Sequence, residues 1–74
     1  MAAFINILGF PAGAKVFIND EEIGIAPIYY KMLKWGKYKV RIEKEGYEPE
    51  VREEFVVWKS DRKKTIYYNL HKIS

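Results

Sequence analysis

Apolar and polar residues alternate along several short stretches of this chain, as they do in β-strands with one buried face. The clearest stretch is 37–43, where Tyr38, Val40 and Ile42 alternate with charged residues. Similar alternation elsewhere predicts that the following residues also point inward: Ile5 and Ile7; Ala14, Val16 and Ile18; and Ile66, Tyr68 and Leu70. About six or seven short strands with closely spaced turns favour a small antiparallel β-sandwich or a small barrel.

The segment 11–27 is predicted to be a β-hairpin around which the rest of the chain is organised. Pro11 and Gly13 provide the turn into its first strand, and Asn19-Asp20 provides the turn into its second. Each turn has a physical basis, because proline restricts φ whereas glycine, asparagine and aspartate tolerate positive φ.

Two segments have less regular patterns. Residues 28–33 allow a strand or a short helix, and their tyrosine and isoleucine content favours the strand. In 47–58 the apolar residues at alternate positions share a face with Glu53, so a β-bulge or an edge position near Glu53 is expected. The inward residues of this segment would be Val51, Phe55 and Val57. The tail 71–74 is predicted to fray.

Three short motifs follow one another along the chain: Pro11-Ala12-Gly13-Ala14, Gly36-x-Tyr38-x-Val40 and Gly46-Tyr47. Together with the hairpin they resemble the PEGA domain family, named for a Pro-Glu-Gly-Ala motif. The chain departs from the family pattern at Ala12, where the motif has glutamate, and at Asp20, where many members have glycine. The resemblance implies a single β-sandwich domain over 1–74 with its core at roughly 5–70. It also implies an accessory module, often in envelope or surface proteins, without general enzymatic activity.

The composition limits the chemistry that the chain can support. It has no cysteine and a single histidine, His71, which excludes disulfides, thiolate metal sites and histidine clusters. No cofactor and no metal site are expected. A chain this short buries only about 60% of its unfolded surface, so its stability should depend on tight packing or on a partner. Glutamine is absent and threonine occurs once, a bias that suggests a thermophilic source and melting above the mesophile range of about 45–65 °C.

The N-terminal residues 1–4 lack the basic region of a secretory signal peptide, and Asn6 interrupts the apolar run. No stretch of the sequence is long and apolar enough to span a membrane. The chain as given is therefore expected to be cytoplasmic, or extracytoplasmic if it was excised from a larger envelope protein.

Acidic residues are frequent, but their arrangement favours solvated surfaces over catalysis. The glutamates of 43–54 mostly alternate with lysine or arginine, as in cross-strand ion pairs. So small a sandwich also has little room for a cleft with two catalytic carboxylates. Asp20, Glu21 and Glu22 are expected to form a solvated turn, since Ca²⁺ needs more oxygen ligands and their spacing differs from an EF-hand loop. We therefore expect no enzymatic activity.

Aromatic residues at outward or strand-end positions suggest a binding surface. Phe4 and Phe10 belong to this group, and the strongest candidates for partner binding are Phe17, Tyr67, Trp35 and Trp58. Aromatic side chains are enriched in the cores of protein interfaces. We therefore expect protein–protein binding, or self-association as a homodimer, through exposed strand edges and outward aromatic residues.

The basic and aromatic stretch 29–41 supports an alternative function. Lysines and aromatic side chains on a sheet can bind single-stranded nucleic acid by phosphate neutralisation and base stacking. The basic residues are Lys31, Lys34, Lys37, Lys39 and Arg41, the aromatic ones are Tyr29, Tyr30, Trp35 and Tyr38, and Lys59, Arg62, Lys63 and Lys64 could extend the group. The same lysines also suit the outward face of amphipathic strands and the protection of sheet edges. A carbohydrate or cell-surface binding module, with aromatic rings stacked on sugars, is a third alternative.

Overall fold

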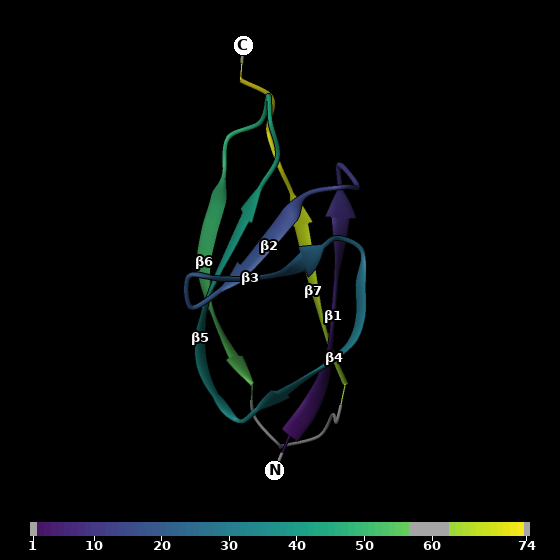
Figure 1. Cartoon of the computed structure of the whole chain (residues 1–74), viewed down its shortest axis with the longest axis vertical. Helices are drawn as coiled ribbons and strands as arrows, with labels where there is room; N and C mark the ends of the chain where they lie inside the picture. Colours follow the sequence, from purple (N-terminus) through teal and green to yellow (C-terminus); the bar gives the residue numbers. More distant parts are fainter. Residues whose placement is uncertain (1, 57–62, 74) are drawn as a thin grey trace.

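The computed structural model describes residues 2–56 and 63–73, which form seven strands in two packed sheets (Figure 1). The strands are β1 (Ala2–Phe10), β2 (Lys15–Ile18), β3 (Glu21–Ile25), β4 (Ile28–Lys34), β5 (Gly36–Glu43), β6 (Glu50–Val56) and β7 (Lys63–Asn69). One sheet has the order β4-β1-β7 and the other β3-β2-β5-β6. The predicted all-β sandwich is confirmed. In the described part of the chain no helix has the length and hydropathy that a membrane crossing requires.

Neighbouring strands are antiparallel with one exception, the pair β1 and β7, which run parallel from Phe4 beside Lys63 to Phe10 beside Asn69. A tight hairpin forces antiparallel pairing, but β1 and β7 are joined through the rest of the chain and are free of that constraint. The predicted antiparallel β-sandwich therefore contains this one parallel pair among the described strands.

The core lies between the two sheets and is built from aliphatic side chains. All of the inward positions predicted from alternation in β1, β2 and β7 are buried, as are Val40 and Ile42 of β5, while Tyr38 is partly buried against the core. The largest fully buried side chains are Ile5, Ile7, Val16, Val40, Ile42 and Val56. The period-two pattern thus identifies the core correctly wherever a strand faces the opposite sheet.

The predicted hairpin is present as β2 and β3. Asn19 and Asp20 form its turn with φ values of 51° and 70°, and Gly13 precedes it with φ of 86°. The Asn19 side-chain oxygen accepts a hydrogen bond from the Lys39 backbone N–H at 2.9 Å, which attaches the turn to β5. Both turn residues tolerate positive φ, so aspartate suits this position of the turn.

The prediction for β6 is wrong in its facing. Val51 and Phe55 are each 56% exposed, whereas Arg52 and Glu54 occupy the inward positions. The pairing of β5 with β6 shows no register shift, so the expected bulge near Glu53 is absent from this pair. The expected edge position is correct, and it explains the facing, because an edge strand borders the open side of the sandwich, where charged groups can pair. Val57 lies outside the described residues.

The predictions for residues 28–33 and for the C-terminal tail have different outcomes. Residues 28–33 are extended, as expected, but a register shift opposite β1 leaves Tyr30 with φ of 59°. The tail was expected to fray, yet the backbone N–H of Glu48 donates to the His71 carbonyl at 2.8 Å and that of Ile73 donates to the Gly46 carbonyl at 3.0 Å. These bonds hold residues 71–73 along the loop that follows β5.

The first and last strands approach each other closely at Gly9. A β-carbon at this position would lie 2.0 Å from the Tyr68 carbonyl oxygen, which no side chain can accept. The Tyr68 hydroxyl in turn donates to the Pro11 carbonyl at 2.6 Å. Glycine is therefore required here for the approach of two backbones, and the parallel pair closes the three-stranded sheet.

Candidate interaction surface

The outer face of the three-stranded sheet carries a group of large apolar side chains. Since Ile5 and Ile7 point into the core, the even-numbered residues of β1 point outward. The strand register sets Met32 beside Phe4 on one side of β1 and Tyr67 beside Leu8 on the other. We call this group the aromatic face, and it consists of Phe4, Leu8, Tyr30, Met32 and Tyr67. Apart from half-buried Leu8, its members are 42–66% exposed.

Tyr30 joins the aromatic face because of the irregularity in β4. The Asn6 side-chain oxygen accepts a hydrogen bond from the Tyr30 backbone N–H at 2.9 Å, which satisfies the displaced backbone. The Tyr30 ring then meets Phe4 edge to face, with 6.4 Å between centroids. The Lys63 ammonium lies 5.9 Å from the Tyr30 centroid, within reach of a cation–π contact.

The three-stranded sheet is also the basic side of the molecule. Its strands, all of them described, contain four lysines and no aspartate or glutamate, whereas the four-stranded sheet contains six glutamates. Lys64 pairs with Glu54 of the other sheet at 3.4 Å. Lys31, Lys34 and Lys63 have no carboxylate within salt-bridge distance among the described residues. Within the described ranges the charged residues of this sheet are therefore all positive.

The four predicted partner-binding residues are not brought together. Tyr67 lies on the aromatic face, but Phe17 lies on the outer face of the opposite sheet, half-buried under the Arg41 guanidinium at 4.4 Å. Trp35 lies at the bend between β4 and β5 and is 42% exposed. Trp58 lies outside the described residues. Outward alternation identified Phe4 and Tyr67 from the sequence. Tyr30 was named for the nucleic-acid alternative alone, and Met32 was missed, because the facing of β4 depends on its register with β1.

The predicted basic stretch is divided between the two sheets. Three residues of the stretch lie on the four-stranded sheet, and each has an acidic partner: Lys37 with Glu53 at 3.3 Å, Lys39 with Asp20 at 3.0 Å, and Arg41 with Glu43 at 3.0 Å. Lys31 and Lys34 belong to β4 on the other sheet. Of the possible extension, Lys59 and Arg62 lie outside the described residues. The five basic residues therefore do not form one continuous patch.

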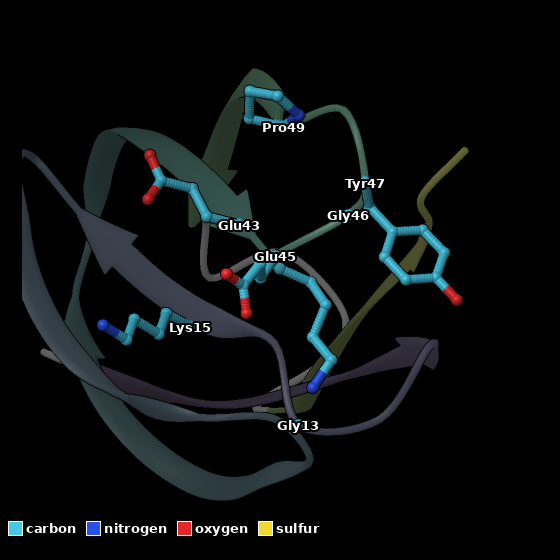
Figure 2. Close-up of a pocket in the computed structure, with 8 residues that line it drawn as sticks. Gly13, Lys15, Glu43, Glu45, Gly46, Tyr47 and Pro49 are labelled. Carbon is cyan, nitrogen blue, oxygen red and sulfur yellow. The ribbon is translucent and has the colours of Figure 1, made fainter. Parts of the chain in front are cut away.

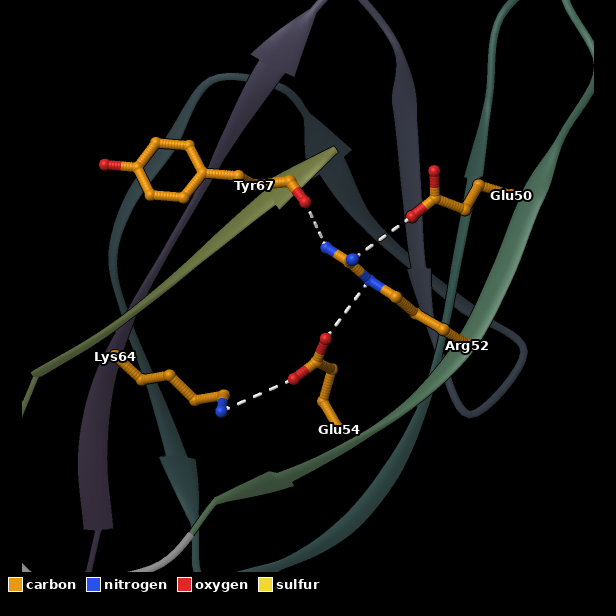
Figure 3. A network of polar contacts seen from close by, with 5 residues as sticks. All are labelled: Glu50, Arg52, Glu54, Lys64 and Tyr67. Atoms are coloured by element: carbon orange, nitrogen blue, oxygen red, sulfur yellow. Dashed lines mark hydrogen bonds and ion pairs between the residues drawn. The ribbon is translucent and has the colours of Figure 1, made fainter. Parts of the chain in front are cut away.

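A polar network closes the side of the sandwich between β6 and β7 (Figure 3). Arg52 points inward and its Nη2 donates to the backbone carbonyl of Tyr67 on β7. Its guanidinium also pairs with Glu50 at 3.3 Å and with Glu54 at 3.1 Å. The inward charges of β6 neutralise one another at the side of the sandwich. The bond from Arg52 to the Tyr67 carbonyl also occupies part of the free edge of β7.

A hollow of about 600 Å³ lies where the turn before β2 meets the loop after β5 (Figure 2). Two lysines and two glutamates line it, so their charges balance. Its lining residues are Gly13, Lys15, Glu43, Lys44, Glu45, Gly46, Tyr47 and Pro49. No group of three or more histidine, aspartate or glutamate side chains in the described ranges is placed to hold a metal ion. The charged lining of the hollow, two lysines and two glutamates, does not match a metal site or a recognised catalytic arrangement.

Comparison with known proteins identifies the family. A search of curated proteins found no match. The family model of the PEGA domain matches residues 4–74, which is nearly the whole chain and includes all seven strands in large part. PEGA domains are generally non-catalytic β modules. The match and the seven-stranded fold agree with the motifs in the sequence, and the chain belongs to the PEGA domain family.

Proposed function

We propose that this PEGA domain is a non-catalytic module that binds another protein, with the aromatic face as its contact surface. The observation that carries the proposal is a set of large apolar side chains on the outer face of three neighbouring strands, in a sheet without carboxylates. Contiguous exposed apolar patches mark interaction sites, and tyrosine, phenylalanine and methionine are enriched in interface cores.

Contacts between neighbouring strands distinguish this surface from scattered aromatic residues. Met32 and Phe4 are cross-strand neighbours, and so are Leu8 and Tyr67, on opposite sides of the same central strand. A partner that covers these positions would remove apolar surface from water at three adjacent strands. On the opposite sheet, Phe17 is already covered by Arg41 and the exposed apolar residues alternate with ion pairs. The three-stranded sheet is thus the better interface.

Charge favours a foreign, acidic partner over a second copy. In a two-fold dimer the same surface is present on both sides of the interface, so the basic sheet of one copy would face the basic sheet of the other. Like charges across an interface disfavour association, whereas a partner with a negative patch is attracted to this face. Self-association through the aromatic face is accordingly a competing outcome.

A photo-cross-linking amino acid in place of Tyr67, used in an extract of the source organism, tests the proposal. The same amino acid in place of Val51 is the matched control, because Val51 is similarly exposed on an edge strand of the other sheet. We expect a protein adduct from position 67 and none from position 51. The adduct should survive nuclease treatment and should decrease when Lys63→Glu is added, because the border charge is then reversed.

Three results would contradict the proposal. Equal adducts from both positions would show that the aromatic face has no privileged role. Loss of the adduct on nuclease treatment would show that the aromatic face binds nucleic acid. An adduct of twice the chain mass as the sole product would replace the foreign partner with a second copy.

A further inference from the structure

The aromatic face ends at β4, which has no neighbouring strand at its outer edge in the part of the chain that the structure describes. Among the described residues the two sheets leave four edge strands, β3, β4, β6 and β7. Arg52 bonds to a carbonyl of β7, and the inward side of β6 carries the charges of that same network. The strand β3 is short and contains two glutamates and a register shift. The strand β4 also has a register shift, and the Tyr38 hydroxyl donates to its Lys34 carbonyl at 2.5 Å. It is, however, the edge strand that contains lysines and no carboxylate and takes no part in the Arg52 network.

We propose that β4 accepts an extended, acidic segment of the partner protein as an added strand. This inference rests on the proposed function and names the partner segment and its place on the same surface. Unpaired N–H and C=O groups of an edge strand are a template for strand addition, in which backbone bonds supply affinity and side chains supply specificity. Pairing without a register shift between β1 and β4 covers Lys31 to Lys34, so the ordered edge has four residues.

The charges of β4 select an acidic strand. Lys31 and Lys34 are three residues apart and therefore project to opposite faces of the strand, so they flank an added strand on both sides. Lys63 adds a third positive charge near Tyr30. Lysines on edge strands commonly prevent pairing between identical chains, and that repulsion operates here against a second copy. The same lysines attract glutamate or aspartate on a foreign strand.

Apolar residues of the added segment would continue the aromatic face. Met32 lies between the two lysines and is 61% exposed on the outer face, beside Phe4. An added strand places alternate side chains next to Met32 and Tyr30, within reach of cross-strand contact. The fitting segment therefore has two acidic residues three positions apart, opposite Lys31 and Lys34, with apolar residues between them.

The test is a selection of random ten-residue peptides displayed on phage against the whole chain, followed by synthesis of the enriched sequence. We expect enrichment of sequences with two acidic residues three positions apart and apolar residues between them. In the charge-reversal variant Lys31→Glu the selected peptide should bind about tenfold more weakly or worse. Lys15→Glu, a reversal at an exposed lysine on the other sheet, is the matched control and should leave binding unchanged.

Backbone methylation of the peptide distinguishes binding at the edge of β4 from binding on the aromatic face. In an added strand, successive N–H groups point alternately toward and away from β4. Methylation of every second peptide nitrogen should therefore abolish binding, and methylation of the others should have little effect. Lys31→Gln removes the charge without reversing it and should give a smaller loss than Lys31→Glu. An unchanged circular dichroism spectrum shows that each variant is folded.

The outcomes distinguish the two proposals. A peptide whose binding shows no alternation on methylation, and is lost in Tyr67→Ser, lies on the aromatic face, which overturns strand addition and leaves the proposed function standing. Enrichment of sequences without acidic residues, or no enrichment, refutes the acidic strand. Displacement of the peptide by a single-stranded oligothymidine, with the same sensitivity to Lys31→Glu, would overturn both proposals in favour of nucleic acid.

Discussion

Tyr68 of the last strand contacts the first strand and the turn that follows it. It is 4% exposed, its hydroxyl donates to the Pro11 carbonyl at 2.6 Å, and its backbone approaches Gly9. Burial raises the pKa of the Tyr68 hydroxyl above its ordinary value of 10.0, because desolvation disfavours the phenolate. A raised pKa in the folded state means that the unfolded chain releases this proton first. The stabilising contribution is therefore complete below pH 10.0 and is lost as pH rises through the raised pKa.

We expect Tyr68→Phe to remove this part of the pH dependence. At neutral pH the variant should lose about 1 kcal/mol in the free energy of unfolding, because the Pro11 carbonyl loses its donor. Above the ordinary tyrosine pKa this difference in the free energy of unfolding should decrease, because the stabilising contribution of Tyr68 in the wild type is lost there. Urea denaturation between about pH 8 and pH 11 measures the difference, with exposed Tyr67→Phe as the control. A difference between Tyr68→Phe and wild type that stays constant over this range would contradict the argument.

At the scale of elements, β6 and β7 are joined by charges rather than by a continuous core. Arg52 satisfies Glu50, Glu54 and the Tyr67 carbonyl at once, and its side chain is 33% exposed. Removing one partner from such a network is costly because the others remain partly desolvated and unpaired. The network also occupies an edge that would otherwise be open.

We expect Arg52→Met to destabilise the fold by about 1–3 kcal/mol, even though methionine preserves much of the length of the side chain. Lys37→Met is the control, because Lys37 forms an exposed pair with Glu53 and its loss should cost less than about 1 kcal/mol. Urea denaturation of the two variants compares them directly. Equal losses would mean that the network between the sheets contributes no more than a surface ion pair.

At the scale of the whole molecule, the two sheets differ in charge. Lysines without carboxylates lie on the three-stranded sheet, and the strand glutamates lie on the other. Repulsion between like faces acts over a Debye length, which is about 30 Å at 0.01 M salt and about 3 Å at 1 M. The isolated chain should therefore resist pairing through the aromatic face until salt screens its lysines.

We expect light scattering to give the monomer mass at low salt and a larger average mass at about 1 M salt, where apolar contact outweighs the screened repulsion. Tyr67→Ser should abolish the increase, because it removes apolar area from the aromatic face. Phe17 lies on the opposite sheet, so Phe17→Ser should leave the increase in mass unchanged. A dimer that persists at low salt, or one that dissociates as salt rises, would contradict this account of the charge distribution.

The sequence determined the strands, the turns and most of the core. Two-residue alternation identified the buried residues of β1, β2, β5 and β7 because each of these strands has one face against the opposite sheet. The turn at Asn19-Asp20 followed from residues that tolerate positive φ, and the motifs beginning at Pro11 and Gly36 indicated the family. These features depend on interactions that are local in the chain.

Only the tertiary structure decided which face of β6 turns inward and which aromatic residues are neighbours. Alternation shows that Val51 and Phe55 share a face, but the position of β6 at the edge puts Arg52 and Glu54 on the inner side. Likewise Phe17 and Tyr67 both alternate outward, yet strand order places them on opposite sheets. A period of two assigns residues to one of two faces. Which face meets the core, and which strands lie side by side, is set by contacts between residues far apart in the chain.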